Sequence, residues 1–436
     1  MTLTLTFSVN VTLKERNIKS FFLMLVDLLS QMVTQLASML IPKMEKEYYE
    51  EEIGKKGIPR KNKQTKFSCC QCGNQLSQQF WYKGYETKKI VTKWFFGELG
   101  YYPQRIECQC CGYSFYPFAK EFGFCDGLWS KDFMEFGIFL VLYMSYQEVI
   151  KTLKHHFGCC FCAMTLWNAV QEYGSAIEFE LPENTNLLMA DGTGVHVGEG
   201  KRGKELRLIL AQSHTGKFRV VNISIKKFKN DWKEDFACLE NHDGLCVCLA
   251  DGDPQIKEAF LFVKGEEGVF SRDLWHIPRQ FKYSAWQDKM KAEHKTEMLG
   301  LLYQTIYIPK GIDNHTVDKE ILKQKEEKFA GIIQWCSELG YSSSEKYLKS
   351  AQKDLFSIYR TNIEFVKFYS CTSIIERAMR EINRREEIGV RWSDHGLLNL
   401  IKLKMTKIYH KPLWRKLFPN YKVKAHKISL SLIDSG

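Results

Sequence analysis

The chain has 436 residues, of which 44% are hydrophobic and 14% aromatic, so it can form packed cores and is not a disordered chain. Its 62 Lys and Arg residues outnumber its 51 Asp and Glu residues, and the formal charge of +11 favours a polyanionic partner such as nucleic acid. Its 15 cysteines include adjacent pairs, which suits metal binding or buried thiols better than the disulfide framework of a secreted protein.

The N-terminal region is predicted to be mainly helical, and it lacks the basic start of a signal peptide. Residues 21–41 are apolar enough to raise the question of a membrane span. However, Asp27, Gln31, Gln35 and Ser38 recur every three to four residues and form one polar stripe. We therefore expect an amphipathic helix that packs on protein, no membrane partner, and a cytoplasmic location.

A cysteine-rich segment follows a basic linker and contains two CxxCG motifs. Their cysteines are Cys69, Cys72, Cys108 and Cys111. The two-residue gap lets both thiolates of a motif reach one Zn²⁺ at about 2.3 Å, and the glycine permits the left-handed turn beneath the metal. Two such pairs complete a closed tetrahedral site, so we expect a structural zinc ribbon that binds DNA or partners or is purely structural. Cys70 and Cys110 are adjacent rivals as ligands, and buried thiols without metal are the alternative.

Residues 145–174 are predicted to form two short helices joined by a turn at Gly158, with the second helix starting near Thr165 as its N-cap. Lys151 and Lys154 lie nearby and would contact DNA if the two helices form a helix-turn-helix. An ordinary helical hairpin is the alternative.

From about residue 185 to 276 the pattern changes to five short β-rich runs, the later ones separated by helical segments, which indicates an α/β sheet. Two of these runs end in Asp-Gly pairs, at Asp191 and Asp251. Carboxylates that converge from neighbouring buried strands repel each other unless a cation lies between them, and Mg²⁺ (or Mn²⁺) prefers such oxygen ligands. Two ions about 3.5–4 Å apart would support phosphodiester chemistry. A turn is the alternative for either pair alone, and Asp253 is interpreted as a helix cap before Pro254.

The segment 371–393 is predicted to be a helix in which Glu376 lies at the edge of an apolar stripe. Glu376 and Arg380, like Glu381 and Arg385, are four residues apart, so surface ion pairs are the simplest interpretation. The site implied by the two aspartates still needs a third acid, and Glu376 is the candidate.

The order of these features resembles the RNase H-like D-D-E transposases of the Mutator-like superclass, which includes many prokaryotic insertion-sequence transposases. The run Asp273-Leu274-Trp275-His276 is similar to the [C/D]-x-x-H signature that follows the second Asp in that superclass. The segment from Thr372 onward is similar to the helix that carries the third acid, of the form [TN]-S/N-x-x-E-x-x-x-R-x-x-x-R. The similarity covers roughly residues 130–410, and a zinc-ribbon front end also occurs in relatives.

This resemblance implies that Asp191, Asp251 and Glu376 are catalytic and hold the metal ions. It implies that His276 contacts the scissile phosphate or flipped DNA, whereas a core histidine satisfied by Asp273 is the alternative.

The resemblance also implies DNA contacts along the third-acid helix. The candidate residues are Arg377, Arg380, Arg384 and Trp392. Pairing of the arginines with Glu381, and a core position for the tryptophan, are the alternatives.

We therefore expect an α/β protein with an RNase H-like catalytic core and a helical insertion, preceded by a zinc β-ribbon and a helix-turn-helix-like region. The expected parts are 1–50 (N-terminal helical region), 67–118 (zinc ribbon), 130–175 (helix-turn-helix), 185–278 (first part of the core), 279–370 (insertion), 371–410 (core helices with the third acid) and 411–436 (basic tail). The expected function is a transposase that binds the terminal inverted repeats of an insertion sequence and performs metal-dependent cleavage and strand transfer into target DNA, as a homodimer or higher homo-oligomer. A nuclease or resolvase without strand transfer and a domesticated, non-catalytic DNA-binding protein are the alternatives.

Overall fold

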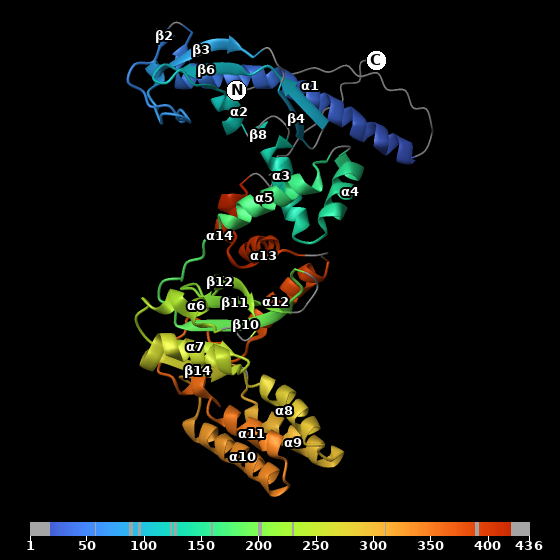
Figure 1. Cartoon of the computed structure of the whole chain (residues 1–436), viewed down its shortest axis with the longest axis vertical. Coiled ribbons are helices and arrows are strands. Elements are labelled where there is room, and N and C mark those ends of the chain that lie inside the picture. Colours follow the sequence, from blue (N-terminus) through green and yellow to red (C-terminus); the bar gives the residue numbers. More distant parts are fainter. Residues whose placement is uncertain are drawn as a thin grey trace, which may run out of the picture. The chain divides into compact units, whose positions relative to one another are not determined.

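The computed structural model describes residues 18–419 apart from short gaps. The gaps are residues 57, 87–89, 95–96, 123, 126–128, 158–159, 199–202, 229–230, 310 and 389–391. The chain divides into two compact units (Figure 1). Unit 1 comprises Met1–Val141, Ser145–Leu166 and Phe418–Gly436, and unit 2 comprises Leu142–Met144 and Trp167–Leu417.

Unit 1 combines one long helix with small sheets. The helix is α1 (Ile18–Glu52), which is followed by the strand pair β1 (Gly54–Lys55) and β2 (Ile58–Pro59). A three-stranded sheet has the order β3-β6-β7, with β3 (Phe80–Tyr85), β6 (Gln104–Cys108) and β7 (Ser114–Phe115). A four-stranded sheet has the order β5-β4-β9-β8, with β4 (Ile90–Trp94), β5 (Gly97–Tyr101), β8 (Phe124–Cys125) and β9 (Trp129–Ser130).

The C-terminal half of α1 packs against these strands. Ile41 and Tyr49 of α1 are buried in one apolar cluster with Phe80 and Ile106 of the β3–β6 pair. By contrast, none of the described side chains between residues 24 and 40 is buried. A helix is therefore present over residues 21–41 as predicted. Among the described side chains of this segment Ile41 alone is buried, so packing of the segment on protein stays a prediction. Within the described residues, no helix is both long and apolar enough to cross a membrane.

Four helices follow the ribbon strands. They are α2 (Pro117–Glu121), α3 (Lys131–Val141), α4 (Tyr146–Phe157) and α5 (Ala163–Ser175). The two helices predicted between residues 145 and 174 are α4 and α5, and the predicted turn at Gly158 lies outside the described residues. Helix α5 begins before the predicted cap Thr165, because the Sγ of Cys162 accepts the Thr165 N–H at 3.4 Å and so occupies the capping position.

Unit 2 is built around a five-stranded mixed sheet with the order β12-β11-β10-β13-β14 (Figure 1). The strands are β10 (Leu187–Val195), β11 (Lys204–Gln212), β12 (Phe218–Lys227), β13 (Cys246–Ala250) and β14 (Gly268–Arg272). Strands β10, β11 and β12 are antiparallel neighbours, whereas β13 runs parallel to β10 and β14 runs parallel to β13. All five predicted strands are present, and the α/β class is confirmed.

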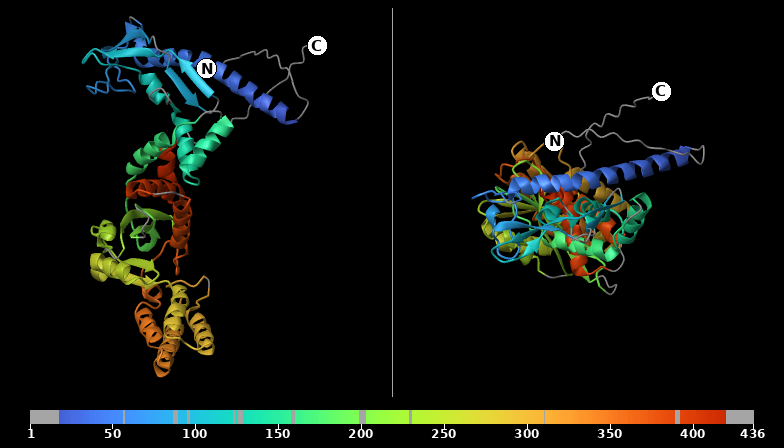
Figure 2. Two further views of the ribbon diagram at one scale, coloured as in Figure 1. Left: turned by 45° about the vertical axis from the view of Figure 1, so that its right-hand side comes forward. Right: turned by 90° about the horizontal axis from the view of Figure 1, so that it is seen from above.

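Helices cover both faces of this sheet (Figure 2). One face carries α6 (Lys233–Phe236) and α7 (Pro254–Lys264), and the other carries α12 (Ser373–Glu387) and α13 (Asp394–Tyr409). The even-numbered Leu188 and Ala190 of β10, with Cys248 of β13, pack in the core on the α7 side. Because side chains alternate along a strand, the odd-numbered positions of β10 and β13 face α12. A hydrogen bond of 3.0 Å between Thr193 Oγ1 and Asn383 Oδ1 links β10 to α12 accordingly.

A helical segment separates β14 from α12 in the sequence. Its helices are α8 (His276–Gln287), α9 (Ala292–Ile306), α10 (Lys319–Glu338) and α11 (Ser342–Gln352). The predicted insertion is therefore helical, but it begins at His276 and not at residue 279. The predicted basic tail starts with α14 (Lys411–Leu417), and residues 420–436 lie outside the described part.

Candidate functional site

Two knuckle loops in unit 1 bring four thiols together. The ligand atoms of Cys69, Cys72, Cys108 and Cys111 all lie within 4.8 Å of one another. The Sγ atoms of Cys69 and Cys111 are 3.5 Å apart, and those of Cys72 and Cys108 are 3.6 Å apart. Thiolates on a tetrahedral Zn²⁺ with bonds of about 2.3 Å would be about 3.8 Å apart, whereas a disulfide needs about 2.05 Å. The cluster therefore has the dimensions of a structural zinc site.

The backbone of each knuckle supports this site. Gly73 and Gly112 have φ of 73° and 70°, the left-handed turn predicted for the glycine of each motif. Burial acts to raise the pKa of Cys69, but the N–H groups of Cys72 and Gln71 outweigh it and lower that pKa to about 7. Backbone N–H groups also act to lower the pKa values of Cys72 and Cys111, but burial and hydrogen bonds with the neighbouring thiols raise both pKa values.

The two alternative zinc ligands, Cys70 and Cys110, lie outside the four-thiol cluster. Cys70 is exposed and does not belong to the four-thiol cluster. Cys110 is also exposed, and its Sγ lies 3.7 Å from the side-chain oxygen of Gln79. Of the six cysteines in this segment, the four of the CxxCG motifs are the ones that could hold a metal ion.

The two predicted catalytic aspartates lie on adjacent parallel strands of unit 2. Asp191 belongs to β10 and Asp251 directly follows β13. Both are odd-numbered positions, so they face α12, on the opposite side of the sheet from the α7 core. The prediction that Asp191 ends its strand is wrong, because β10 continues in antiparallel pairing with β11 as far as Val195. It is the parallel pairing with β13 that stops earlier, at Met189.

The carboxyl group of Asp191 is strongly desolvated. Burial, and next the nearby negative charge of Asp251, raise the pKa of Asp191 to about 7. The Gly192 N–H and the positive charge of His276 act in the opposite direction, and Glu376 adds a further repulsion. Asp191 therefore interacts electrostatically with Asp251, His276 and Glu376, so all four predicted catalytic groups share one neighbourhood.

Glu376 points toward this neighbourhood and away from the predicted surface ion pair. Its Oε1 lies 2.6 Å from Nε2 of His276 and accepts a hydrogen bond from Arg279 Nη1 at 3.2 Å. Partial burial acts to raise the pKa of Glu376, but the hydrogen bond and charge of His276, together with Arg279, lower it. Glu376 thus does not form the predicted i,i+4 ion pair with Arg380. It stays ionised and bonds two side chains from the first turn of α8.

Asp273 fixes the starts of the two helices that carry His276 and Glu376. Its Oδ1 accepts the N–H of Trp275 at 2.8 Å, and its Oδ2 accepts the N–H and hydroxyl of Thr372 at 2.8 and 2.5 Å. The nearest approach of Asp273 Oδ2 to His276 Nε2 is 4.0 Å. The side chain of His276 is therefore hydrogen-bonded to Glu376, and its hydrogen bond to Asp273 is made by the backbone N–H, at 3.1 Å to the Asp273 carbonyl oxygen. This differs from the alternative of a core histidine satisfied by Asp273.

The predicted metal triad does not form a closed ligand set. In the part of the chain that the structure describes, the side chains of Asp273, His276 and Glu376 form the second group that could hold a metal ion, besides the four cysteines. Asp191 and Asp251 do not belong to a group of this kind. Hydrogen bonds from Trp275 and Thr372 already occupy both oxygens of Asp273, so that group is explained without a metal. Asp253 accepts the Gln255 N–H at 2.7 Å and caps α7, as predicted.

The arginines of α12 divide into exposed and buried positions. Arg377 and Arg380 are exposed, as a phosphate contact requires. Arg384 is also exposed, but its Nη1 bonds Glu381 Oε1 at 2.6 Å, so it follows the alternative of pairing with Glu381. Arg385 is fully buried, and the predicted pair of Glu381 with Arg385 is replaced by contacts of Glu381 with Arg384 and Lys404.

The prediction that Trp392 stacks on a base is wrong. Trp392 is only 8% exposed, and its indole N–H donates to the backbone oxygen of Glu386 at 3.1 Å. The guanidinium of Arg385 lies 4.9 Å from its ring centroid. A base could stack there only by displacing Arg385, so the core position is the correct alternative.

Two functional candidates were missed in the sequence. Arg279, which bonds Glu376, lies three residues after His276 on α8, and helical spacing could have indicated it. Arg272 lies beneath the Asp251-Gly252 turn, where a Cβ on Gly252 would be 2.3 Å from its guanidinium carbon. Its Nη2 lies 3.6 Å from Asp354 Oδ2, a contact between β14 and the segment after α11 that no local pattern reveals.

The two lysines predicted to contact DNA, Lys151 and Lys154, lie on the exposed face of α4, opposite the buried Val149 and Leu153. They belong to unit 1, whereas the acidic site belongs to unit 2. Their role in DNA binding stays a prediction.

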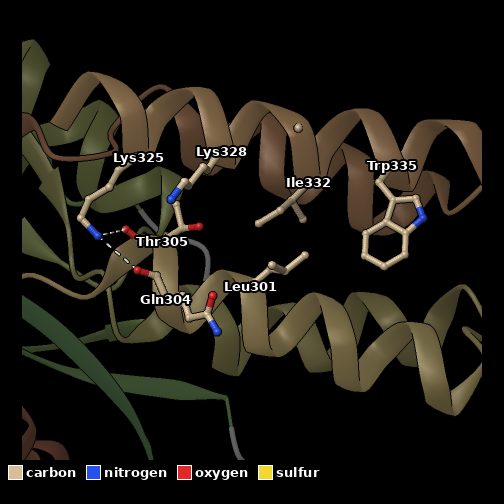
Figure 3. A pocket seen from close by; sticks show the side chains of 8 residues that line it. Leu301, Gln304, Thr305, Lys325, Lys328, Ile332 and Trp335 are labelled. Carbon is tan, nitrogen blue, oxygen red and sulfur yellow. Dashed lines mark hydrogen bonds between the residues drawn. The ribbon is translucent and has the colours of Figure 1, made fainter. Parts of the chain in front are cut away.

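A hollow of about 290 Å³ lies between α9 and α10 in the helical insertion (Figure 3). Leu301, Ile332 and Trp335 line its apolar part. At its polar end Lys325 donates to the backbone oxygens of Gln304 and Thr305 at 3.1 and 3.2 Å, which satisfies the last turn of α9. None of the predicted site residues lines it, so the hollow is separate from the acidic site.

Comparison with known proteins adds nothing to this geometry, because no protein-family model and no curated protein matches the chain.

Replacing a cluster cysteine should remove zinc. We expect Cys72→Ser to lower bound zinc from about one ion per chain to near zero and to lower the melting temperature, because the four-thiol site supplies folding energy to unit 1. Elemental analysis and a thermal melt measure both effects. Cys70→Ser is the matched control and should keep its zinc. Equal loss in the two variants would contradict the ligand assignment.

Replacing Asp191 should stabilise the metal-free protein at high pH. The pKa of Asp191 lies at about 7 in the fold against its usual 3.8, so the ionised form costs up to about 4 kcal/mol. The destabilisation by ionised Asp191 has its full value above pH 7 and decreases as the pH falls toward 4. Asp191→Asn should therefore raise the free energy of unfolding at pH 8 and far less at pH 4.5, as measured by urea denaturation without added divalent cations.

The exposed Asp243 provides the control for that experiment. Asp243→Asn should leave the unfolding free energy within about 0.5 kcal/mol at both pH values. A destabilised Asp191→Asn variant at pH 8 would show that the carboxylate is stabilised by the fold, contrary to its desolvated position.

Proposed function

We propose that this protein is a D-D-E transposase with an RNase H-like core, which uses Mg²⁺ or Mn²⁺ to cleave DNA at the ends of an insertion sequence and to transfer the exposed 3′ ends into target DNA. The observation that carries this proposal is the meeting of four groups from separate parts of the chain. Asp191 and Asp251 come from neighbouring parallel strands, and Glu376 of α12, which is bonded to His276, lies near enough to add to the repulsion on Asp191.

The architecture of unit 2 supports an RNase H-like core. Three antiparallel strands are followed by two strands parallel to the first, and helices cover both faces. In this arrangement the first strand lies at the centre of the sheet, beside the fourth. Acids placed on these two strands are therefore neighbours. Helix α12, which comes later in the sequence, covers the face that they share and can supply a third acid.

The electrostatics support a cation between the aspartates. Burial, and next the negative charge of Asp251, raise the pKa of Asp191 to about 7, so the ionised form of Asp191 is costly in this position. A divalent cation would neutralise this repulsion and supply activation of a hydroxyl nucleophile and stabilisation of the leaving oxygen. Asp191 would then lose its proton and serve with Asp251 as a ligand.

The groups around these acids have positioning roles in the proposal. Glu376 is kept ionised by His276 and Arg279, so it is available as the third carboxylate. His276 projects from the first turn of α8, where it can donate a hydrogen bond to a phosphate oxygen once Glu376 turns to the cation. Exposed Arg377 and Arg380 on the same helix as Glu376 can neutralise neighbouring phosphates.

Unit 1 would supply recognition of the element ends in this proposal. The four-thiol ribbon and the exposed Lys151 and Lys154 of α4 are the candidate DNA contacts. Since two ends must be joined, we propose at least a dimer. The part of α1 that carries the exposed Leu29 and Met39 is the candidate interface between copies.

Loss of an active-site carboxylate should abolish the chemistry but not DNA binding. We expect Asp251→Asn and Glu376→Gln each to lower Mn²⁺-dependent cleavage by roughly a thousandfold or more, because each removes a charged metal ligand. The substrate is a duplex that carries the inverted repeat flanking the gene, and a gel-shift assay with the same duplex measures binding. A pre-cut end with a free 3′-OH, mixed with supercoiled plasmid, measures strand transfer.

Glu387, an exposed acid of the same helix, provides the control. Glu387→Gln should retain both activities. Strand transfer that survives Glu376→Gln would disprove the assignment of the third acid. Cleavage without any strand transfer from pre-cut ends by the unmodified protein would instead identify a nuclease or resolvase.

A further inference from the structure

Helix α8 carries a row of exposed aromatic side chains that neither the fold nor the acidic site uses. Trp275 at its N-cap is 43% exposed, Tyr283 is 66% exposed and Trp286 is 76% exposed. The opposite side of the helix is buried through residues that include Ile277 and Phe281. An isolated exposed aromatic is ordinary, but three on one helix, each large and open to solvent, form a surface that needs an explanation.

These residues lie on one face and lead away from the acidic site. Positions 275, 279, 283 and 286 are four, four and three residues apart, the spacing of a single helix face. The row begins beside His276, and its second member, Arg279, bonds Glu376. With a rise of 1.5 Å per residue it extends for about 16 Å, which corresponds to about four or five stacked nucleotides.

The positive charge of this helix face indicates which kind of ligand would bind to it. Helix α8 has no acidic residue, and Arg279 and Lys282 are both exposed on it. Asp288 follows the helix and accepts the N–H groups of Ser343 and Ser344, and the next residue, Lys289, is exposed. Aromatic rings interleaved with cations bind unpaired polynucleotide strands, because every base has a π-face and every linkage carries a phosphate. In a base-paired duplex the faces of the bases are covered by their neighbours in the stack.

We propose that the α8 row, which we define as Trp275, Arg279, Lys282, Tyr283 and Trp286, is a binding track for single-stranded DNA that leads a strand to the acidic site. Tyr283 and Trp286 stack on unpaired bases, and Lys282 contacts the backbone. Trp275 is the member nearest the acids, and its ring also contacts Tyr303 of α9, with centroids 6.3 Å apart. The track deepens the proposed function, since it predicts that DNA is locally unpaired when it reaches Asp191 and Asp251.

The track can be tested by binding alone, without catalysis. The probe is a fluorescein-labelled oligothymidylate of about 20 nucleotides, long enough to cover the row and unable to pair with itself. We expect Trp286→Ala, and more strongly the double variant Tyr283→Ala/Trp286→Ala, to weaken binding roughly five- to hundredfold in fluorescence anisotropy. Lys282→Gln should lower the slope of log affinity against log salt by about 0.7. Binding of a duplex of the same length should change by less than about twofold, since stacking is not available to it.

Phe262 of α7 is the matched control, because it is an aromatic residue of the same unit and is 70% exposed. Phe262→Ala should leave binding of the oligothymidylate unchanged. Since the substituted side chains are exposed, thermal melts of all variants should match the unmodified protein. The proposal is overturned if the double variant binds the single strand as tightly as the unmodified protein, or if the duplex is weakened equally.

The outcome is separable from the fate of the proposed function. Asp251→Asn should bind the oligothymidylate normally even though cleavage is lost. If the double variant binds normally while Asp251→Asn abolishes cleavage, the track is wrong and the transposase proposal stands. If the double variant loses binding while no cleavage or transfer is found, the track stands and the transposase proposal fails.

Discussion

The arrangement of the acidic site depends on the hydrogen bonds that Asp273 accepts from the starts of two helices. One oxygen takes the N–H of Trp275 at the beginning of α8, and the other takes the N–H and hydroxyl of Thr372 at the beginning of α12. In the sequence, α9, α10 and α11 lie between these two helices. Because His276 follows Trp275 directly and Glu376 lies one turn after Thr372, a single buried carboxylate sets the position of both. It also explains why the hydroxyl of Thr372 does not cap α12 itself.

A second constraint comes from the sheet. The antiparallel strands β11 and β12 lie on one side of β10, and the parallel strands β13 and β14 lie on the other, so β10 is central. Its residues Leu187–Ala190 are buried, and the next residue, Asp191, is partly buried with a desolvated carboxyl group. A carboxyl group in this position is desolvated, and its pKa rises before any neighbour is considered. Groups of both charges surround this carboxyl group, since His276 acts to lower its pKa and Glu376 acts to raise it.

The four-cysteine segment of unit 1 is stabilised by other means than the large sheet of unit 2. Its strands are short, and its core is completed by α1 on one side and by the four thiols on the other. A small sheet of this kind buries little apolar surface by itself. The long helix α1 adds to its core, and a metal ion held by the four thiols would add folding energy. Among the described side chains of α1, the buried ones begin at Ile41.

The sequence by itself determined the parts whose rules are local. The spacing of two CxxCG motifs predicts the zinc ligands, the β-rich runs predict all five strands of the large sheet, and the Asp-Gly pairs with the Glu376 helix predict the acids that meet. Only the tertiary structure decided the outcomes that depend on contacts between distant segments. Glu376 is bonded to His276 and Arg279 and not to Arg380, and Trp392 is buried against Arg385 and cannot stack on a base. The same holds for Asp191, which lies within a strand and not at its end, because β11 continues to pair beyond it. The physical reason is that helical and strand periodicity give the face on which a side chain lies, whereas the fold decides which charged or aromatic group occupies the space opposite that face.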